Sequence, residues 1–359
     1  MPLSPEVLSA AAAALGARGV EPVADLTTSG RATVARLRVT GGDVETAVLK
    51  LGGDHVMANW CGLAFLDHVA PGAGPRLLAA DRRFVVMEDL GAGPSLKSVL
   101  AGDDPAAAEA ALVAHASALG RLAAATRGRR NEYARLVREL GGDESLLAPV
   151  PSERMVLDAW AAAERELPAL GLRVSPAAAR DVERLRALWA VPHAALSFSP
   201  GDTCPDNHVL THDGSARFFD VDFCSFHPTA FDAAYHARPR FPTCNYLLEL
   251  PEPAAARARA AYASCVPVDG AEVDEAVVAW TAWNAGEALA TLLRRDRRLG
   301  PTSFRQMLLW RLGATAERCE ELDAMRGLGT LLGELAEALA GRWPEIGPMP
   351  LYPAFRGQG

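Results

Sequence analysis

The chain of 359 residues is half hydrophobic and carries 36 basic and 44 acidic side chains, for a net charge of −8. This acidic balance argues against a nucleic-acid-binding protein, because neutralising phosphates requires a concentrated basic surface. No apolar run reaches the roughly 18 to 20 residues that cross a bilayer, and the N-terminus lacks the basic stretch of a signal peptide. We therefore expect a cytoplasmic protein that does not interact with membranes.

The first 91 residues predict a small lobe of five strands with a leading helix. Ser4, Pro5 and Glu6 combine a capping side chain, a proline at the first helical position and an acid in the first turn, so a helix is expected up to Gly16. Alternating polarity then begins at Val23, and three antiparallel strands are expected before residue 52. The later elements expected in this lobe are a helix over residues 54–69 and strands over 75–80 and 84–87.

Residues 92–359 predict a larger, mainly helical lobe. The chain is alanine-rich and carries apolar residues at helical spacing, interrupted by the segment 199–222. The clearest predicted helices cover residues 106–127, 152–167, 274–295, 302–326 and 328–340. The fold class is therefore α+β and bilobal, with a small N-terminal lobe over 1–91 and a larger helical lobe over 92–359.

The six cysteines stand at positions 61, 204, 224, 244, 265 and 319. They form no C-x-x-C pair and have no histidine partner at zinc-finger spacing. We therefore expect reduced thiols that mostly fill the core.

Within 199–222, Asp202 is followed five positions later by Asn207, and a short strand-turn-strand pattern then ends at Asp220. Kinase-type enzymes use an Asp and Asn at this spacing, with a later Asp, to bring a hydroxyl and a magnesium nucleotide together. For Asp202 and Asn207 alone, capping of turns beside glycine and proline would be the simpler interpretation. The position of Asp220 after a hydrophobic strand favours the functional interpretation.

This pattern resembles the aminoglycoside phosphotransferase and choline-kinase-like family, small-molecule kinases of the protein-kinase fold. The family's H-G-D-x-x-x-x-N and I-D-[WFY]-[ED] segments correspond here to Pro200-Gly201-Asp202 through Asn207 and to residues 219–222. The resemblance implies that Asp202 orients the substrate hydroxyl and accepts its proton, and that Asn207 and Asp220 hold Mg²⁺. Asp222 would be a second metal-side acid or an anchor outside the metal shell.

The resemblance also implies an ATP or GTP site in the N-terminal lobe over 1–91, and a catalytic loop over 199–222 and a substrate cleft in the helical lobe over 92–359. Lys50 ends an apolar strand as the phosphate-contacting lysine of kinases does, although a lysine at a strand end is usually only solvated. Backbone groups around Glu88 and Leu90 would bond the adenine edge. Ser29 and Gly30 lie in the loop that would cover the nucleotide, where a plain hairpin turn is an equally good interpretation.

Three positions depart from the family pattern. Asn59 stands where the family has a glutamate that pairs with the lysine, Pro200 replaces the histidine of H-G-D, and Ala123 replaces a histidine in the preceding helix. Asparagine can hydrogen-bond Lys50 but cannot neutralise it. These changes keep open an alternative function, a catalytically impaired kinase-like protein that binds a nucleotide or a partner.

The sequence thus predicts a small-molecule phosphotransferase that acts on a hydroxyl, with antibiotics and secondary metabolites as candidate acceptors. The acidic net charge mildly favours a cationic substrate. Asp232 and Glu287 are candidates to face it, although solvation or capping is the better interpretation of either residue alone. The short segment between Asp220 and Asp232 argues against a protein kinase, which needs an activation loop there.

Overall fold

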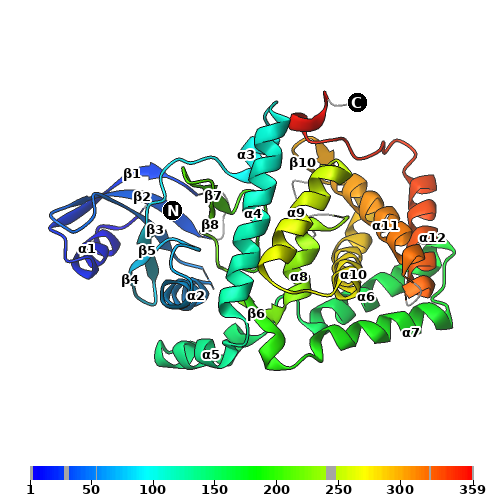
Figure 1. Cartoon of the computed structure of the whole chain (residues 1–359), viewed down its shortest axis with the longest axis horizontal. Helices are drawn as coiled ribbons and strands as arrows, with labels where there is room; N and C mark the ends of the chain where they lie inside the picture. The colour runs from blue at the N-terminus through cyan, green and yellow to red at the C-terminus, as the bar shows by residue number, and fades with distance from the viewer. Residues whose placement is uncertain (1–2, 28–31, 54, 240–247, 323–324, 358–359) are drawn as a thin grey trace.

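The computed structural model describes residues 3–27, 32–53, 55–239, 248–322 and 325–357. A β-rich N-terminal lobe joins a larger helical lobe, which confirms the predicted α+β fold class (Figure 1). The elements of the first lobe are α1 (Pro5–Ala14), β1 (Gly19–Asp25), β2 (Thr33–Thr40), β3 (Thr46–Leu51), α2 (Val56–Val69), β4 (Leu77–Ala80) and β5 (Phe84–Glu88).

The five strands form one antiparallel sheet in the order β1-β2-β3-β5-β4. Side chains alternate between its faces, as the period of a strand requires. Leu49 and Val86 belong to the core that includes α1, whereas Val85 and Met87 belong to the core that includes α2. Lys50, next to Leu49, therefore points to the α2 side, where the second lobe begins.

The second lobe starts with five helices, α3 (Leu96–Leu100), α4 (Pro105–Thr126), α5 (Arg130–Glu139), α6 (Glu153–Glu166) and α7 (Pro176–Arg184). Short strands and one helix follow: β6 (Leu196–Ser199), β7 (His208–Leu210), β8 (Ala216–Phe218), β9 (Ser225–Pro228) and α8 (Thr229–Ala233). The chain ends with α9 (Glu252–Cys265), α10 (Gly270–Arg294), β10 (Arg298–Leu299), β11 (Thr302–Ser303), α11 (Phe304–Glu321) and α12 (Arg326–Arg342). Single 3₁₀ turns are η1 (Glu144–Leu147), η2 (Leu167–Leu170), η3 (Leu185–Trp189), η4 (His193–Ala195), η5 (Ala234–His236) and η7 (Pro353–Phe355).

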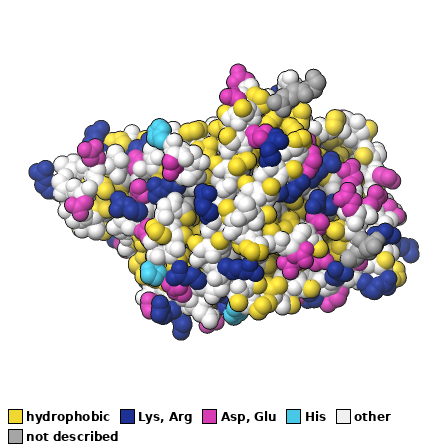
Figure 2. Space-filling model, viewed as in Figure 1, with side chains coloured by type: hydrophobic (Ala, Val, Ile, Leu, Met, Phe, Trp, Pro, Cys, Tyr) yellow, Lys and Arg dark blue, Asp and Glu magenta, His cyan; other side chains and the backbone are white. Residues whose placement is uncertain are grey.

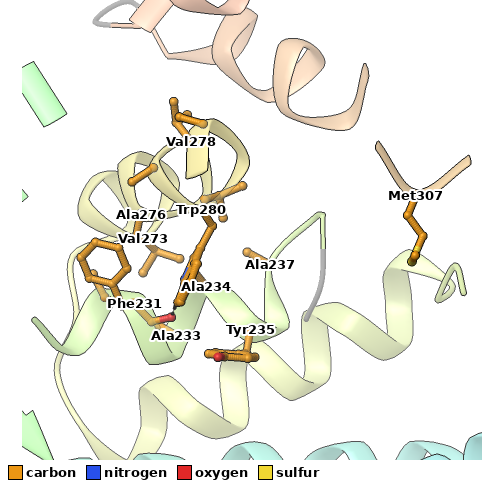
Figure 3. Close-up of a cluster of buried hydrophobic side chains, with 14 of the residues drawn as sticks. Phe231, Ala233, Ala234, Tyr235, Ala237, Val273, Ala276, Val278, Trp280 and Met307 are labelled. Atoms are coloured by element: carbon orange, nitrogen blue, oxygen red, sulfur yellow. Dashed lines mark hydrogen bonds between the residues drawn. The ribbon is translucent and has the colours of Figure 1, made fainter. Parts of the chain in front are cut away.

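The helices of this lobe pack in neighbouring pairs, with α4 along α9, α6 along α10 and α11 along α12. The crossing of α6 and α10 is close, because a Cβ atom on Gly286 would lie 1.9 Å from the backbone oxygen of Ala159. Trp280 of α10 contacts the rings of Phe231 and Tyr235, with centroid distances of 5.8 and 5.9 Å (Figure 3). This aromatic contact anchors α8 and η5, and the Tyr235 hydroxyl donates a hydrogen bond to the backbone oxygen of Gly201, next to Asp202.

Basic and acidic side chains alternate over the face shown in Figure 2, and no single-sign expanse is seen there. Across the ranges that the structure describes, no helix is long and apolar enough to span a bilayer.

Candidate active site

Two loops meet at one end of the β6–β9 pair. These strands are antiparallel, and Ser199 lies opposite Ser225. The loop after β6 (200–207) and the loop before β9 (219–224) therefore lie at the same end of the pair. The four acidic and amide residues predicted from the sequence are divided between these loops, with Asp202 and Asn207 on the first and Asp220 and Asp222 on the second.

Asp202 is partly buried, and its Oδ1 accepts a hydrogen bond from the backbone N–H of Cys204 at 3.3 Å. Burial, followed by the negative charge of Asp220, raises the pKa of Asp202 to about 6. A carboxylate with this pKa is mostly ionised at neutral pH and still basic enough to accept a proton efficiently. Asp202 thus has the properties of a general base.

Asn207 and Asp220 offer oxygen donors suited to a hard cation. The Asn207 side-chain nitrogen donates to the backbone oxygen of Asp202 at 3.0 Å, which leaves its side-chain oxygen as the atom suited to a metal. The pKa of Asp220 is raised, mainly by burial and also by the charge of Asp222, against the opposing effect of Lys50. A divalent cation would relieve the repulsion between these carboxylates, so the residues fit Mg²⁺.

The described residues hold no group of three or more His, Cys, Asp or Glu side chains arranged to bind a metal. Mg²⁺ at nucleotide sites usually needs only one or two protein carboxylates, because substrate phosphates and water supply the remaining ligands. The donor set of Asn207 and Asp220 is of this kind.

Lys50 reaches across from the N-terminal lobe to the second loop. Its Nζ lies 3.2 Å from Asp220 Oδ1 and 3.5 Å from Asn59 Oδ1, and it also donates a hydrogen bond to Asp222 Oδ1. The predicted lysine is therefore not simply solvated, since it is 8% exposed. The contact between Lys50 and Asn59 expected from the sequence is present. Asp222 also binds the Lys50 ammonium, a contact that the sequence did not predict.

The predicted adenine-binding segment lies at the end of β5. The Glu88 carboxylate is held by Arg217 Nη2 at 2.7 Å and by the backbone N–H of Arg76 at 3.0 Å. The Glu88 side chain is thus engaged in a structural contact, which leaves backbone groups of this segment for a ligand. Ser29 and Gly30, predicted in the covering loop, lie outside the residues that the structure describes.

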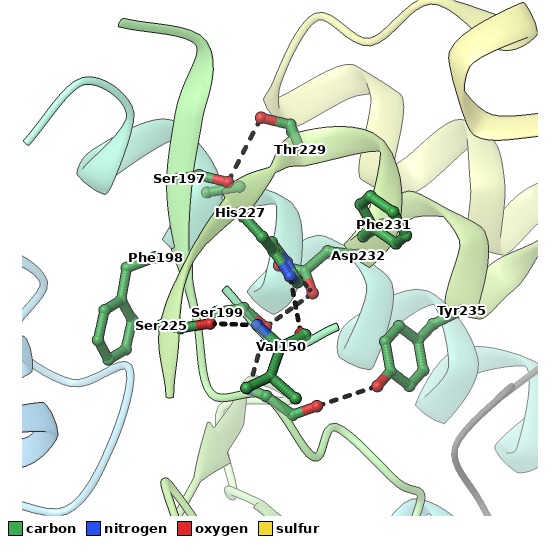
Figure 4. Close-up of polar contacts among 12 residues, drawn as sticks. Val150, Ser197, Phe198, Ser199, Ser225, His227, Thr229, Phe231, Asp232 and Tyr235 are labelled. Carbon is green, nitrogen blue, oxygen red and sulfur yellow. Dashed lines mark hydrogen bonds and ion pairs between the residues drawn. The ribbon is translucent and has the colours of Figure 1, made fainter. Parts of the chain in front are cut away.

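Several groups that the sequence did not indicate hold the backbone of the 200–207 loop. Ser199 Oγ accepts from the Gly201 N–H at 3.0 Å and donates to Asp232 at 2.8 Å (Figure 4). The Tyr235 hydroxyl donates to the Gly201 oxygen at 3.1 Å. His115 Nε2 donates to the oxygen of Thr203 at 3.1 Å. These contacts brace the loop where Pro200 replaces a histidine.

His115 lies in α4, about two turns before Ala123. In the sequence, its position within an apolar helical stretch was the only indication of its burial. Its ring is buried and its Nδ1 contacts His236 Nε2 at 3.0 Å. Burial lowers the pKa of His115 to about 4, so it is neutral at pH 7. A neutral ring can donate from Nε2 to Thr203 and accept at Nδ1.

Two expectations are corrected. Asp232 is fully buried, with its Oδ1 bonded to Ser199 and 3.1 Å from His227 Nε2, so it does not face a substrate. Cys204 is disulfide-bonded, so the expectation of a reduced thiol is wrong at this position. The free cysteines among the described residues are Cys61, Cys224, Cys265 and Cys319.

Comparisons with solved structures place the fold. A putative aminoglycoside phosphotransferase from Ralstonia eutropha matches with a TM-score of 0.52 at 14% identity, covering 94% of this chain and 99% of that one. An aminoglycoside phosphotransferase from Alicyclobacillus acidocaldarius matches with a TM-score of 0.51 at 13% identity, covering 94% and 97%. A choline kinase from Streptococcus pneumoniae covers 90% and 98% at 11% identity, but its TM-score of 0.46 is too low to support an argument.

No protein-family model and no curated protein sequence matches the chain. The two aminoglycoside phosphotransferase structures named above, with TM-scores above 0.5, show that the chain has the protein-kinase-like fold, as the resemblance implied. Identities of 13 and 14% do not transfer an activity.

Proposed function

We propose that this chain is an O-phosphotransferase that moves a phosphoryl group from ATP or GTP to a hydroxyl of a small molecule. The observation that carries the proposal is the contact between Lys50 Nζ and Asp220 Oδ1 at 3.2 Å, which joins two predicted groups from opposite lobes. Asp202 and Asn207 lie on the adjoining loop. The protein-kinase-like fold, which the chain shares with an aminoglycoside phosphotransferase and a putative one, is compatible with this activity.

Asp202 would act on the acceptor. An alcohol must lose its proton as its oxygen attacks phosphorus, and a carboxylate within hydrogen-bond reach supplies both direction and a proton acceptor. The pKa of about 6 keeps Asp202 ionised before the reaction and able to hold the proton afterwards. The hydrogen bonds to the Gly201 and Thr203 oxygens fix the backbone on either side of it.

The nucleotide would lie between Lys50 and the end of β5. The Lys50 ammonium would contact its phosphates, and backbone groups at Glu88 and Leu90 would contact the base, with Ser29 and Gly30 in the covering loop. Asn207 and Asp220 would hold Mg²⁺, which neutralises charge on the phosphates when bound. In this arrangement Lys50 contacts the phosphates, Asn207 and Asp220 hold the metal ion, and Asp202 accepts the acceptor's proton.

The acceptor would be a hydroxylated small molecule, and antibiotics and secondary metabolites are the first classes to screen. The net charge of −8 favours a cationic acceptor. The exposed Glu287 lines a cavity of about 330 Å³ between α10 and α11, but Arg297 and Arg311 line it too. The Arg297 guanidinium lies over the Phe304 ring, 4.9 Å from its centroid, so this cavity adds no support for a cationic acceptor.

The direct test is incubation with Mg²⁺ and ATP or GTP against a panel of hydroxylated antibiotics and metabolites. Mass spectrometry of the acceptor should show the gain of one phosphoryl group. We expect Asp202→Asn to slow this gain by about 10²- to 10⁴-fold, because the base is lost. Nucleotide affinity should change little, because Asp202 does not contact the nucleotide in the proposed arrangement.

Asp206→Asn is the matched control. Asp206 lies in the same loop but is exposed and pairs with Lys97 at 3.0 Å, so its removal should leave most of the activity. A wild-type rate in Asp202→Asn would contradict the role of Asp202. Nucleotide binding without turnover on the whole panel would favour the alternative, an impaired kinase-like protein.

A further inference from the structure

The environment of Lys50 contains two carboxylates rather than one. Asp222 Oδ1 accepts hydrogen bonds from both Lys50 Nζ and Asn59 Nδ2, and Asp220 Oδ1 lies 3.2 Å from the same ammonium. The side chains of Lys50 and Asp222 are 10% and 9% exposed, whereas that of Asp220 is 26% exposed. A buried ammonium needs a counter-charge, and both candidates lie on the 219–224 loop.

The two carboxylates differ in their surroundings. Asp222 Oδ1 accepts from two side chains, those of Lys50 and Asn59, and is shielded from solvent. Asp220 is the more exposed carboxylate, and its loop packs against the loop that carries Asp202, where a Cβ atom on Gly201 would lie 2.1 Å from the backbone oxygen of Phe223. Asp222 is therefore the more buried and more fully bonded partner of the lysine, and Asp220 is the carboxylate on the open side of the pair.

Asn59 completes this arrangement. Its Nδ2 donates to Asp222 and, at 3.0 Å, to the backbone oxygen of His55, while its Oδ1 faces Lys50 at 3.5 Å. A carboxylate at position 59 could not donate to Asp222 and would repel it. The asparagine at 59 and the aspartate at 222 therefore form a matched pair.

We propose that Asp222 is a positioning residue that supplies the counter-charge of Lys50, in place of an acidic side chain at position 59, and holds the ammonium where it meets the nucleotide phosphates. This inference rests on the proposed function. On this view Asn59 does not impair the site, because the acidic partner of Lys50 is at position 222 instead of position 59. Asp220 is thereby left available on the side of the metal.

The test exchanges the two side chains without changing their size. Asp222→Asn leaves Lys50 with Asp220 as its remaining carboxylate contact, and Asn59→Asp places a third carboxylate beside the same ammonium. The double variant Asn59→Asp/Asp222→Asn has the same net charge as the wild type, with the amide and the carboxylate exchanged. The measurements are calorimetric affinity for MgATP and MgGTP, which needs no acceptor, and the nucleotide KM and kcat on any acceptor found.

We expect each single variant to weaken nucleotide affinity or kcat/KM by about 10- to 100-fold, the range seen when a group that orients a functional side chain is lost. The double variant should recover at least about tenfold of the loss in Asp222→Asn, because the carboxylate again lies beside Lys50. In a Lys50→Met background, Asp222→Asn should have almost no further effect. A purely structural role for Asp222 would instead give a loss that persists without the lysine.

Three results would overturn the inference: wild-type affinity in Asp222→Asn, absence of rescue in a folded double variant, or full additivity with Lys50→Met. If Asp222→Asn does not fold, the double variant compared with Asn59→Asp still tests the exchange. A wild-type chain that binds neither MgATP nor MgGTP would remove the proposed function and this inference together. A wild-type chain that binds them, with variants that bind equally well, would remove this inference alone.

Discussion

Gly201 precedes Asp202 in a left-handed backbone conformation, with a φ of +86°. A Cβ atom there would lie 2.1 Å from the backbone oxygen of Phe223, so the loop with Asp202 presses directly against the loop with Asp220. We expect Gly201→Ala to lower the free energy of unfolding by about 2–4 kcal/mol, because the unfavourable φ is added to a steric displacement. Activity should fall with it, since Asp202 moves relative to Asp220.

Gly214 provides the control for this prediction. It also has a left-handed backbone, with a φ of +76°, but nothing lies within 4 Å of a Cβ placed there. Gly214→Ala should therefore cost only the backbone term of about 1–2 kcal/mol and leave activity intact. Urea denaturation of both variants measures the difference, and equal losses would mean that the contact with Phe223 is not a constraint.

At the scale of residues, the sequence indicated which candidate groups lie on the two loops but not the contacts that they make. Asp202, Asn207 and Asp220 follow from spacing within one short segment, because local geometry fixes how a loop and hairpin present their side chains. The contact between Lys50 and Asp222 joins positions 172 residues apart, and no local pattern encodes it. The missing acid at position 59 left an impaired protein open as an alternative, and the position of Asp222 beside the lysine could not be read from the sequence.

At the scale of elements, α4 contacts the loop that carries Asp202 through His115. The ring is fully buried and neighbours His208, His236 and the charge of Asp232. Burial lowers its pKa from 6.5 to about 4. Below pH 6.5 the unfolded chain binds a proton at His115, whereas the folded chain binds one only near pH 4. The associated stability is therefore fully present above pH 6.5 and is lost as the pH falls toward 4.

We expect this single group to account for about 3 kcal/mol of the loss of stability over that interval. Measuring the free energy of unfolding against pH tests it. His115→Gln does not titrate and still carries a side-chain N–H for Thr203, so its curve should be flatter than the wild-type curve between pH 6.5 and 4. His212→Gln, at an exposed position, should follow the wild type. Parallel curves for wild type and His115→Gln would contradict the prediction.

Most helices could be predicted because their starts carry local signals. Asp104 caps α4 by accepting from the N–H groups of Ala106 and Ala107, with Pro105 at the first helical position. Helix α9 (Glu252–Cys265) was not predicted, because its alternating alanine and arginine residues show little contrast between faces. Its alanines and Tyr262 form a buried face only because the helix packs along α4. The pairing of β6 with β9 was also not predicted, because each strand is short and its partner is distant in sequence.

At the scale of the whole molecule, the β7–β8 hairpin belongs to the second lobe by sequence but contacts the first. Figure 1 shows it between the sheet and α4. The Phe218 N–H donates to the oxygen of Ala73 at 2.8 Å, and Arg217 Nη2 donates to the oxygen of Gly74 at 2.6 Å. The same guanidinium holds the Glu88 carboxylate at 2.7 Å. These contacts fix the segment proposed to bind adenine relative to the loops that carry the catalytic groups.

Removing Arg217 should therefore affect both stability and nucleotide use. Arg217 and Arg76 both approach Glu88 Oε2, at 2.7 and 3.9 Å, but their side chains are 18% and 60% exposed. We expect Arg217→Gln to lower the free energy of unfolding by about 1.5–3 kcal/mol, as for a hydrogen-bonded charged group, and to raise the nucleotide KM more than it lowers kcat. Arg76→Gln should cost less than about 1 kcal/mol, because an exposed ion pair contributes little. Denaturation and steady-state kinetics on both variants measure these effects. Equal effects of the two substitutions would show that the contact between the lobes does not depend on Arg217.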